Sequence, residues 1–157
     1  QMVKLGFVLC TVVLGLGDDS AQGHSNVEHD LSTQTLSAED LVVVTHMPKE
    51  IMRSYGQHTK AINDAYCSRH GHRFLADETD YASRDDRSGH WNKVQAVLSV
   101  LSASSDHGLA AVLWLDADAI LSNFNFDALS LVRQAREAGA DLVICRDLSI
   151  PKERNTC

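Results

Sequence analysis

The chain has 157 residues and a formal net charge of −7, with 44% hydrophobic and 22% charged residues. This length suits one compact domain, and the composition excludes a disordered or fibrous chain. The balance of 14 Lys+Arg against 21 Asp+Glu disfavours a nucleic-acid-binding module, which normally presents a basic surface. The four cysteines show no CxxC or CxxH spacing, so the sequence does not predict a cysteine-based zinc site.

Residues 1–17 contain an apolar run of 13 residues, LGFVLCTVVLGLG, which follows the single Lys4. A spanning helix needs roughly 20 apolar residues, so this run predicts a secretory signal peptide or a short signal-anchor. The alternative interpretation is a buried strand or helix of the fold. Residues 18–39 are polar without a sustained period and predict a disordered stem or linker.

Strands and helices are expected to alternate from residue 40 onward. Short apolar or β-branched runs predict strands at 41–45, 73–76, 110–115 and 141–145. Apolar positions at helical spacing predict helices over 50–69, 91–101 and 127–138, with Gly71 and Gly139 as the terminating glycines. Trp91 is expected in the core, because aromatic side chains carry large buried areas.

This alternation implies right-handed crossovers and a mainly parallel α/β sheet with helices on both faces. In such sheets, ligands bind at the carboxyl ends of the strands. The sequence therefore predicts a binding site at Thr45 and His46, the loop after Ala76, and the Asp116-Ala117-Asp118 stretch.

Asp116 and Asp118 follow directly on the apolar run AAVLWL. Side chains alternate along a strand, so both carboxylates are expected to emerge together at its end. Two close carboxylates repel unless a cation or a proton lies between them, and Mg²⁺ or Mn²⁺ prefers such oxygen ligands together with substrate phosphates. The alternative is that Asp116 caps a turn and Asp118 is solvated. The eight histidines show no two-His-plus-carboxylate spacing that predicts a metal site.

Three segments together resemble one family of glycosyltransferases. WLDADAIL (114–121) resembles the D-x-D strand of nucleotide-sugar glycosyltransferases with the GT-A fold. NDAYCSRHGHRF (63–74) and WNKVQAVLSVL (91–101) resemble segments of the fungal Golgi galactosyl- and mannosyltransferases and the plant xyloglucan xylosyltransferases. The resemblance covers about residues 40–150, and it departs from the family's usual Ala and Tyr at Cys67 and His72.

The resemblance implies a Rossmann-like GT-A domain whose N-terminal, donor-binding half spans 40–157. Family members continue into an acceptor-binding half that usually supplies a His ligand, whereas only 39 residues follow Asp118 here and none is His. The expected domain is therefore incomplete at its C-terminus. The resemblance further implies transfer of a hexose or pentose from a UDP- or GDP-linked sugar to a glycan or glycoprotein acceptor. It implies retention of configuration, Mn²⁺ or Mg²⁺ as cofactor, and a place in the secretory pathway at the Golgi lumen or membrane.

By the same resemblance, Asp118 is the direct metal ligand and Asp116 meets the metal or the donor ribose. Thr45 and His46 would hold the nucleotide, with a plain strand-end turn as the alternative. Lys93 would reach the diphosphate, with a solvated lysine as the alternative. Tyr66 and His70 lie four residues apart on one helical face and predict packing plus a satisfied hydrogen bond.

Two other functions fit parts of the sequence. Haloacid-dehalogenase-type phosphatases also place D-x-D after an apolar strand, with the first Asp as nucleophile. They usually have Thr or Val two residues after the second Asp, where this chain has Ile120, and they need downstream motifs that about 40 residues do not hold. The other is a non-catalytic, truncated nucleotide-sugar-binding fragment.

Overall fold

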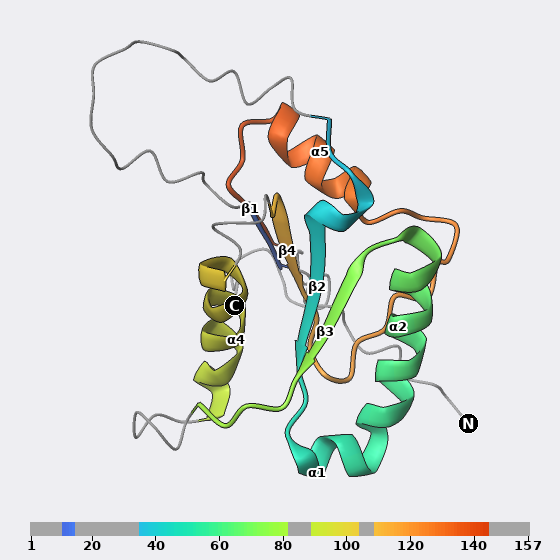
Figure 1. Cartoon of the computed structure of the whole chain (residues 1–157), viewed down its shortest axis with the longest axis vertical. Coiled ribbons are helices and arrows are strands. Elements are labelled where there is room, and N and C mark those ends of the chain that lie inside the picture. The colour runs from blue at the N-terminus through green and yellow to red at the C-terminus, as the bar shows by residue number, and fades with distance from the viewer. Residues whose placement is uncertain (1–10, 15–34, 82–88, 104–108, 145–157) are drawn as a thin grey trace, which may run out of the picture.

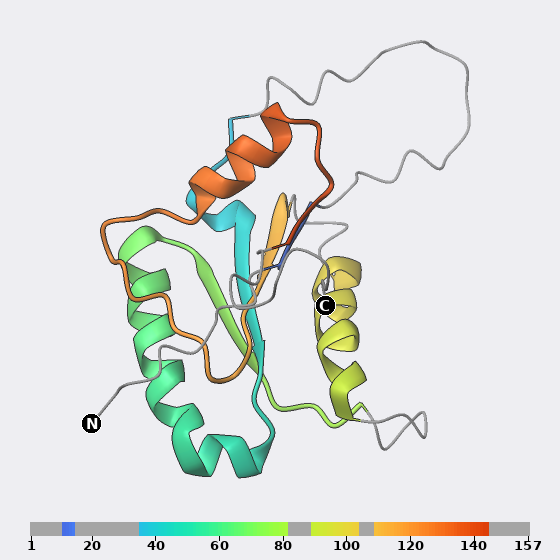
Figure 2. The same cartoon turned by 180° about the vertical axis from the view of Figure 1, so that it is seen from behind.

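The structure is a computed structural model that describes residues 11–14, 35–81, 89–103 and 109–144. These residues form a five-stranded sheet with helices packed against it (Figures 1 and 2). The strands are β1 (Thr11–Leu14), β2 (Leu41–His46), β3 (Arg73–Asp77), β4 (Ala111–Trp114) and β5 (Leu142–Ile144). The helices are α1 (Lys49–Ile51), α2 (Gln57–His70), α4 (Asn92–Ala103) and α5 (Leu129–Glu137).

The strand order is β3-β2-β4-β1-β5, and β2 pairs in parallel with both β3 and β4. The expected α/β fold with a parallel sheet between helices is therefore confirmed for these three strands. The fourth expected strand, β5, does not pair with β4. Instead β1 lies between them and runs antiparallel to both.

The strand β1 comes from the apolar N-terminal run, of which Thr11–Leu14 pair with β4 and β5. The other residues of 1–17, and residues 18–34 of the expected stem, lie outside the described residues. The signal segment and the stem therefore stay predictions. Among the described residues, no helix is long and apolar enough to cross a membrane.

Two apolar layers enclose the parallel part of the sheet. Because side chains alternate along β2, Leu41 and Val43 pack on one face with Tyr66 of α2 and Val132 of α5. Val42 and Val44 pack on the other face, in a cluster with Ala96 and Val100 of α4. Figure 1 accordingly shows α2 and α4 on opposite sides of the sheet.

The helix predicted at 50–69 is divided into α1, a π-helical turn at Met52–Gly56, and α2. Gly71 ends α2 with φ of 74°, as the sequence predicts, and Gly139 follows α5 with φ of 62°. The prediction of a buried Trp91 is wrong, because this side chain is 54% exposed. Trp91 lies in a 3₁₀ turn before α4, and the buried positions of that helix are Asn92, Ala96 and Val100.

Candidate functional site at the carboxyl edge of the sheet

The carboxyl ends of β2, β3 and β4 meet at one edge of the sheet. The Leu115 N–H donates to Val44 O at 2.9 Å, and the Met47 N–H donates to Asp77 O at 2.8 Å. The residues that follow each strand are therefore held beside one another. This arrangement brings His46 and Asp116 to the same edge, as the sequence predicts.

The two aspartates lie on a turn rather than on a strand. Strand β4 ends at Trp114, and the Ala119 N–H donates to Asp116 O at 2.9 Å, which closes a turn over residues 116–119. The strand alternation that was expected to pair Asp116 with Asp118 therefore ends before it reaches them. The turn itself determines where each carboxylate lies.

The two carboxylates differ in their surroundings. Trp114 Nε1–H donates to Asp116 Oδ1 at 3.0 Å, which fixes this half-buried side chain. Asp118 is exposed. Carboxylate oxygens are the ligands that hard divalent cations prefer, so these two are candidate ligands of such an ion.

A pocket of about 520 Å³ lies where β2 and β3 end. It is lined by His46, Pro48, Lys49, Glu50, Glu78, Asp80 and Asn92. The His46 Nε2 lies 2.9 Å from Thr79 O, and a carbonyl only accepts, so Nε2 carries a proton; in the neutral ring, Nδ1 then holds the lone pair. The volume lies within the range of small-molecule sites, and among the described lining residues there are carboxylate acceptors, the cation Lys49 and the amide Asn92.

Thr45 and Lys93 do not line this pocket. Thr45 precedes His46 on β2 and therefore faces the other side of the sheet, where it is fully buried. Its Oγ1 has no hydrogen-bond partner within the part of the chain that the structure describes. Lys93 is exposed on the first turn of α4, one residue beyond the buried Asn92.

The sequence analysis missed four residues of the pocket, Pro48, Lys49, Glu50 and Asn92. Lys49 begins α1 three residues after β2 ends, so its closeness to the strand end was the available signal. Asn92 was not predicted because the resemblance of this segment to the family rests on its neighbours, Trp91 and Lys93.

A stripe of polar side chains on α2 holds the turn in place. Thr59 Oγ1 donates to Ala117 O at 2.8 Å. One helical turn later, the amide of Asn63 donates to Ala119 O at 3.0 Å and its oxygen accepts from the Leu121 N–H at 2.9 Å. Asn63 is fully buried, so both partners depend on it for their hydrogen bonds.

The stripe continues along α2 to the opposite edge of the sheet. The Tyr66 hydroxyl donates to Phe126 O at 2.6 Å and accepts from the Ala128 N–H at 3.0 Å. His70 Nε2 lies 3.2 Å from Phe124 O, and its ring centroid lies 4.6 Å from that of Tyr66. The expectation that Tyr66 and His70 pack and form satisfied hydrogen bonds is confirmed. Figure 1 shows the segment between β4 and α5 running beside α2.

The arrangement defines a class of protein before any comparison is made. A parallel sheet with helices on both faces, and a ligand site after its central strands, is typical of α/β proteins that bind nucleotides. A model of the galactosyl transferase GMA12/MNN10 family matches residues 37–138, and the chain belongs to this family. Comparisons with curated proteins and with solved structures find no match.

The matched residues include Thr45, His46, Lys93, Asp116 and Asp118. Membership of the family supports glycosyl transfer as the class of activity, and it favours this class over a phosphatase. It also confirms the family that the three sequence segments resemble.

Proposed function

We propose that the chain transfers a hexose or pentose from a UDP- or GDP-linked sugar to a glycan or glycoprotein acceptor. One observation carries the proposal: the family match covers the residues that form both the turn at Asp116 and the pocket at His46. These two features lie at the ends of neighbouring parallel strands, β4 and β2. A nucleoside and its diphosphate need two such adjoining sites, one for the base and one for the charge.

The pocket is the proposed site of the nucleoside. The carboxylates of Glu78 and Asp80 accept hydrogen bonds from N–H groups of the base and from ribose hydroxyls. His46 Nδ1 offers one more acceptor, and the Asn92 amide both donates and accepts. Lys49 provides a positive charge at the same pocket, where it attracts the phosphates.

The turn is the proposed site of the metal ion, Mn²⁺ or Mg²⁺. Asp118 and the second oxygen of Asp116 are the ligands that this chain offers. When bound, the ion neutralises the charge that develops on the diphosphate leaving group. Lys93, exposed at the start of α4, is proposed as a further contact of the diphosphate.

Retention of configuration at the transferred sugar and a place in the Golgi complete the proposal. The Golgi is typical of the family. The N-terminal apolar run would direct the chain there as a signal peptide or signal-anchor, with membrane association in the second case.

Mass spectrometry of transfer products tests the proposed function. The full chain is incubated with Mn²⁺, a panel of oligosaccharide acceptors and one of several UDP- or GDP-linked hexoses and pentoses. The proposal predicts an acceptor that gains one sugar, with loss of the product in Asp118→Ala. Release of inorganic phosphate from sugar phosphates, without transfer, would contradict it.

A further inference from the structure

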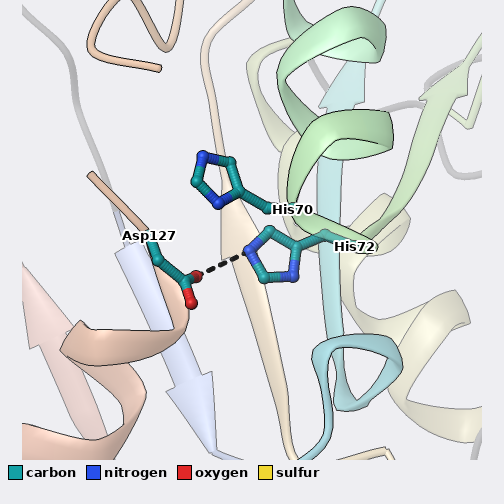
Figure 3. A group of neighbouring side chains, drawn as sticks. All are labelled: His70, His72 and Asp127. Carbon is teal, nitrogen blue, oxygen red and sulfur yellow. Dashed lines mark hydrogen bonds and ion pairs between the residues drawn. The ribbon is translucent and has the colours of Figure 1, made fainter. Parts of the chain in front are cut away.

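A cluster of two histidines and one carboxylate lies at the amino edge of the sheet, away from the proposed donor site. His70 ends α2, His72 precedes β3, and Asp127 precedes α5. Their three ligand atoms lie within 4.8 Å of one another. Figure 3 shows the three side chains pointing toward one another from these separate elements. The sequence analysis found no such group, because Asp127 follows His72 by 55 residues.

Both histidines use one ring nitrogen on a backbone carbonyl. His72 Nδ1 lies 2.9 Å from Ala38 O, and His70 Nε2 lies 3.2 Å from Phe124 O. A carbonyl oxygen only accepts, so each of these nitrogens carries a proton. In the neutral imidazole, the other nitrogen of each ring then holds a lone pair. These are His72 Nε2 and His70 Nδ1.

Both of these nitrogens face the carboxylate of Asp127, and the contact of His72 Nε2 with Asp127 is a hydrogen bond and ion pair when this nitrogen also carries a proton. His72 Nε2 lies 2.9 Å from Asp127 Oδ1, and the His70 and His72 rings stack at 5.7 Å between centroids. A proton on His72 Nε2 satisfies this one contact and leaves His70 Nδ1 outside it. With both rings neutral, the three electron-pair donors converge on one point, where a single metal ion would satisfy them all. Histidines that bind metal ions almost always donate the other ring N–H to a carbonyl or carboxylate, as both do here.

We propose that His70 Nδ1, His72 Nε2 and Asp127 bind a divalent transition-metal ion, Zn²⁺ in the first instance. Imidazole and carboxylate ligands suit zinc, with bonds of about 2.0–2.2 Å in a tetrahedral site. Neighbouring ligand atoms of such a site lie about 3.3 Å apart, which follows from these bond lengths. The ligand atoms lie within 4.8 Å of one another, so binding would draw them together by up to about 1.5 Å.

The surroundings of the cluster fit an ion with three protein ligands and one open position. The His72 side chain is fully buried, whereas that of Asp127 is 40% exposed and admits water as the fourth ligand. Asp127 Oδ1 also accepts from the Leu129 N–H at 2.9 Å, which orients the carboxylate. The ion would join the end of α2, the start of β3 and the start of α5. It differs from the hard cation proposed at Asp118, which has only oxygen ligands.

The test is metal binding by the full chain, measured with Co²⁺ as a spectroscopic probe and with Zn²⁺ in thermal unfolding. The proposal predicts one tightly bound ion with the visible absorption of tetrahedral cobalt, displaced by zinc. Zinc at about 100-fold above its Kd should raise Tm by about 5–10 °C. A chain without this absorption, or without a Tm shift, overturns the proposal.

Variants of the proposed ligands, compared with control variants, test where the ion binds. Asp127→Asn keeps an oxygen that accepts from Leu129 but removes the charge, and His72→Tyr keeps an aromatic ring but removes the ligand nitrogen. Each should weaken binding at least about 100-fold. His58→Ala, an exposed histidine of α2, and Asp118→Ala should leave the cobalt spectrum unchanged. Equal binding in Asp127→Asn and the original chain contradicts the proposal, even if His72→Tyr fails to fold.

Discussion

The two edges of the sheet differ in how completely their polar groups are bonded. At the amino edge, His70, His72 and Asp127 all have hydrogen-bond partners within the described residues. One buried hydroxyl near them, Ser130 Oγ of α5, has none there. At the carboxyl edge, Asp118 is exposed, and the buried oxygens Thr45 Oγ1 and Asp77 Oδ2 have no partner among the described residues. Two buried polar atoms without a described partner, beside an exposed carboxylate, are typical of a site that binds a ligand.

The polar stripe of α2 connects these two edges. Thr59 and Asn63 hold the turn after β4, and Tyr66 and His70 hold the segment that leads to α5. The same helix therefore supports the carboxyl edge, called the open edge below, and forms part of the amino edge, called the closed edge. Variants along this helix can show which edge depends on which contact.

Asn63→Ala should have the largest effect on stability. It removes both hydrogen bonds of a fully buried side chain and leaves Ala119 O and the Leu121 N–H without their partner. We expect a loss of about 2–4 kcal/mol in the free energy of unfolding, measured by urea denaturation. Ser68→Ala, an exposed substitution on the same helix, is the control. A loss no larger than in this control would contradict the role of the stripe.

Gly71→Ala, at the closed edge, should lower the free energy of unfolding by about 2 kcal/mol. Gly71 has φ of 74°, and a Cβ there would lie 3.2 Å from the Cβ of Ala38, so strain and crowding add. Gly139→Ala is the matched control, because φ is 62° there but nothing lies within 4 Å of the added atom. It should cost about 1 kcal/mol. Equal losses of free energy in the two variants would mean that the contact with Ala38 has no effect.

Lys49→Ala should weaken nucleotide binding about tenfold, which corresponds to about 1.4 kcal/mol. Lys49 lines the pocket, so its charge acts on the phosphates within a partly enclosed space. Lys93→Ala gives the comparison, because Lys93 is exposed and lies outside the lining. Calorimetric titration of nucleotide into both variants shows which lysine contributes more to the affinity. A larger loss in Lys93→Ala would favour the assignment made from the sequence.

Cys67→Ala should change the pH dependence of stability by up to about 1.4 kcal/mol per pH unit. Burial, with a smaller contribution from Asp64, raises the pKa of the Cys67 thiol from 9.0 to about 12. The folded chain therefore keeps a proton that the unfolded chain loses, so this contribution is complete below pH 9 and is lost as pH rises toward 12. Urea denaturation between pH 8 and pH 10 should show that the free energy of unfolding falls less with pH in Cys67→Ala than in the original chain. Parallel profiles would contradict the raised pKa.

The parallel strands and the binding edge were predictable, because β-branched runs and terminating glycines act locally. The positions of Thr45, His46 and Asp116 at that edge followed from the order of the elements alone. The exposed Trp91 and the cluster of His70, His72 and Asp127 were not predictable, because both depend on where distant segments pack. The antiparallel place of β1 likewise depends on pairing across about 100 residues.

Calorimetric titration of UDP and GDP, with and without Mn²⁺, tests the central claim most directly. The account predicts Mn²⁺-dependent binding of one nucleotide by the full chain. Binding should be lost in Asp118→Ala at the open edge and retained in Asp127→Asn at the closed edge. Nucleotide binding that is equally strong without Mn²⁺, or that survives in Asp118→Ala, would contradict a donor site built on the turn after β4.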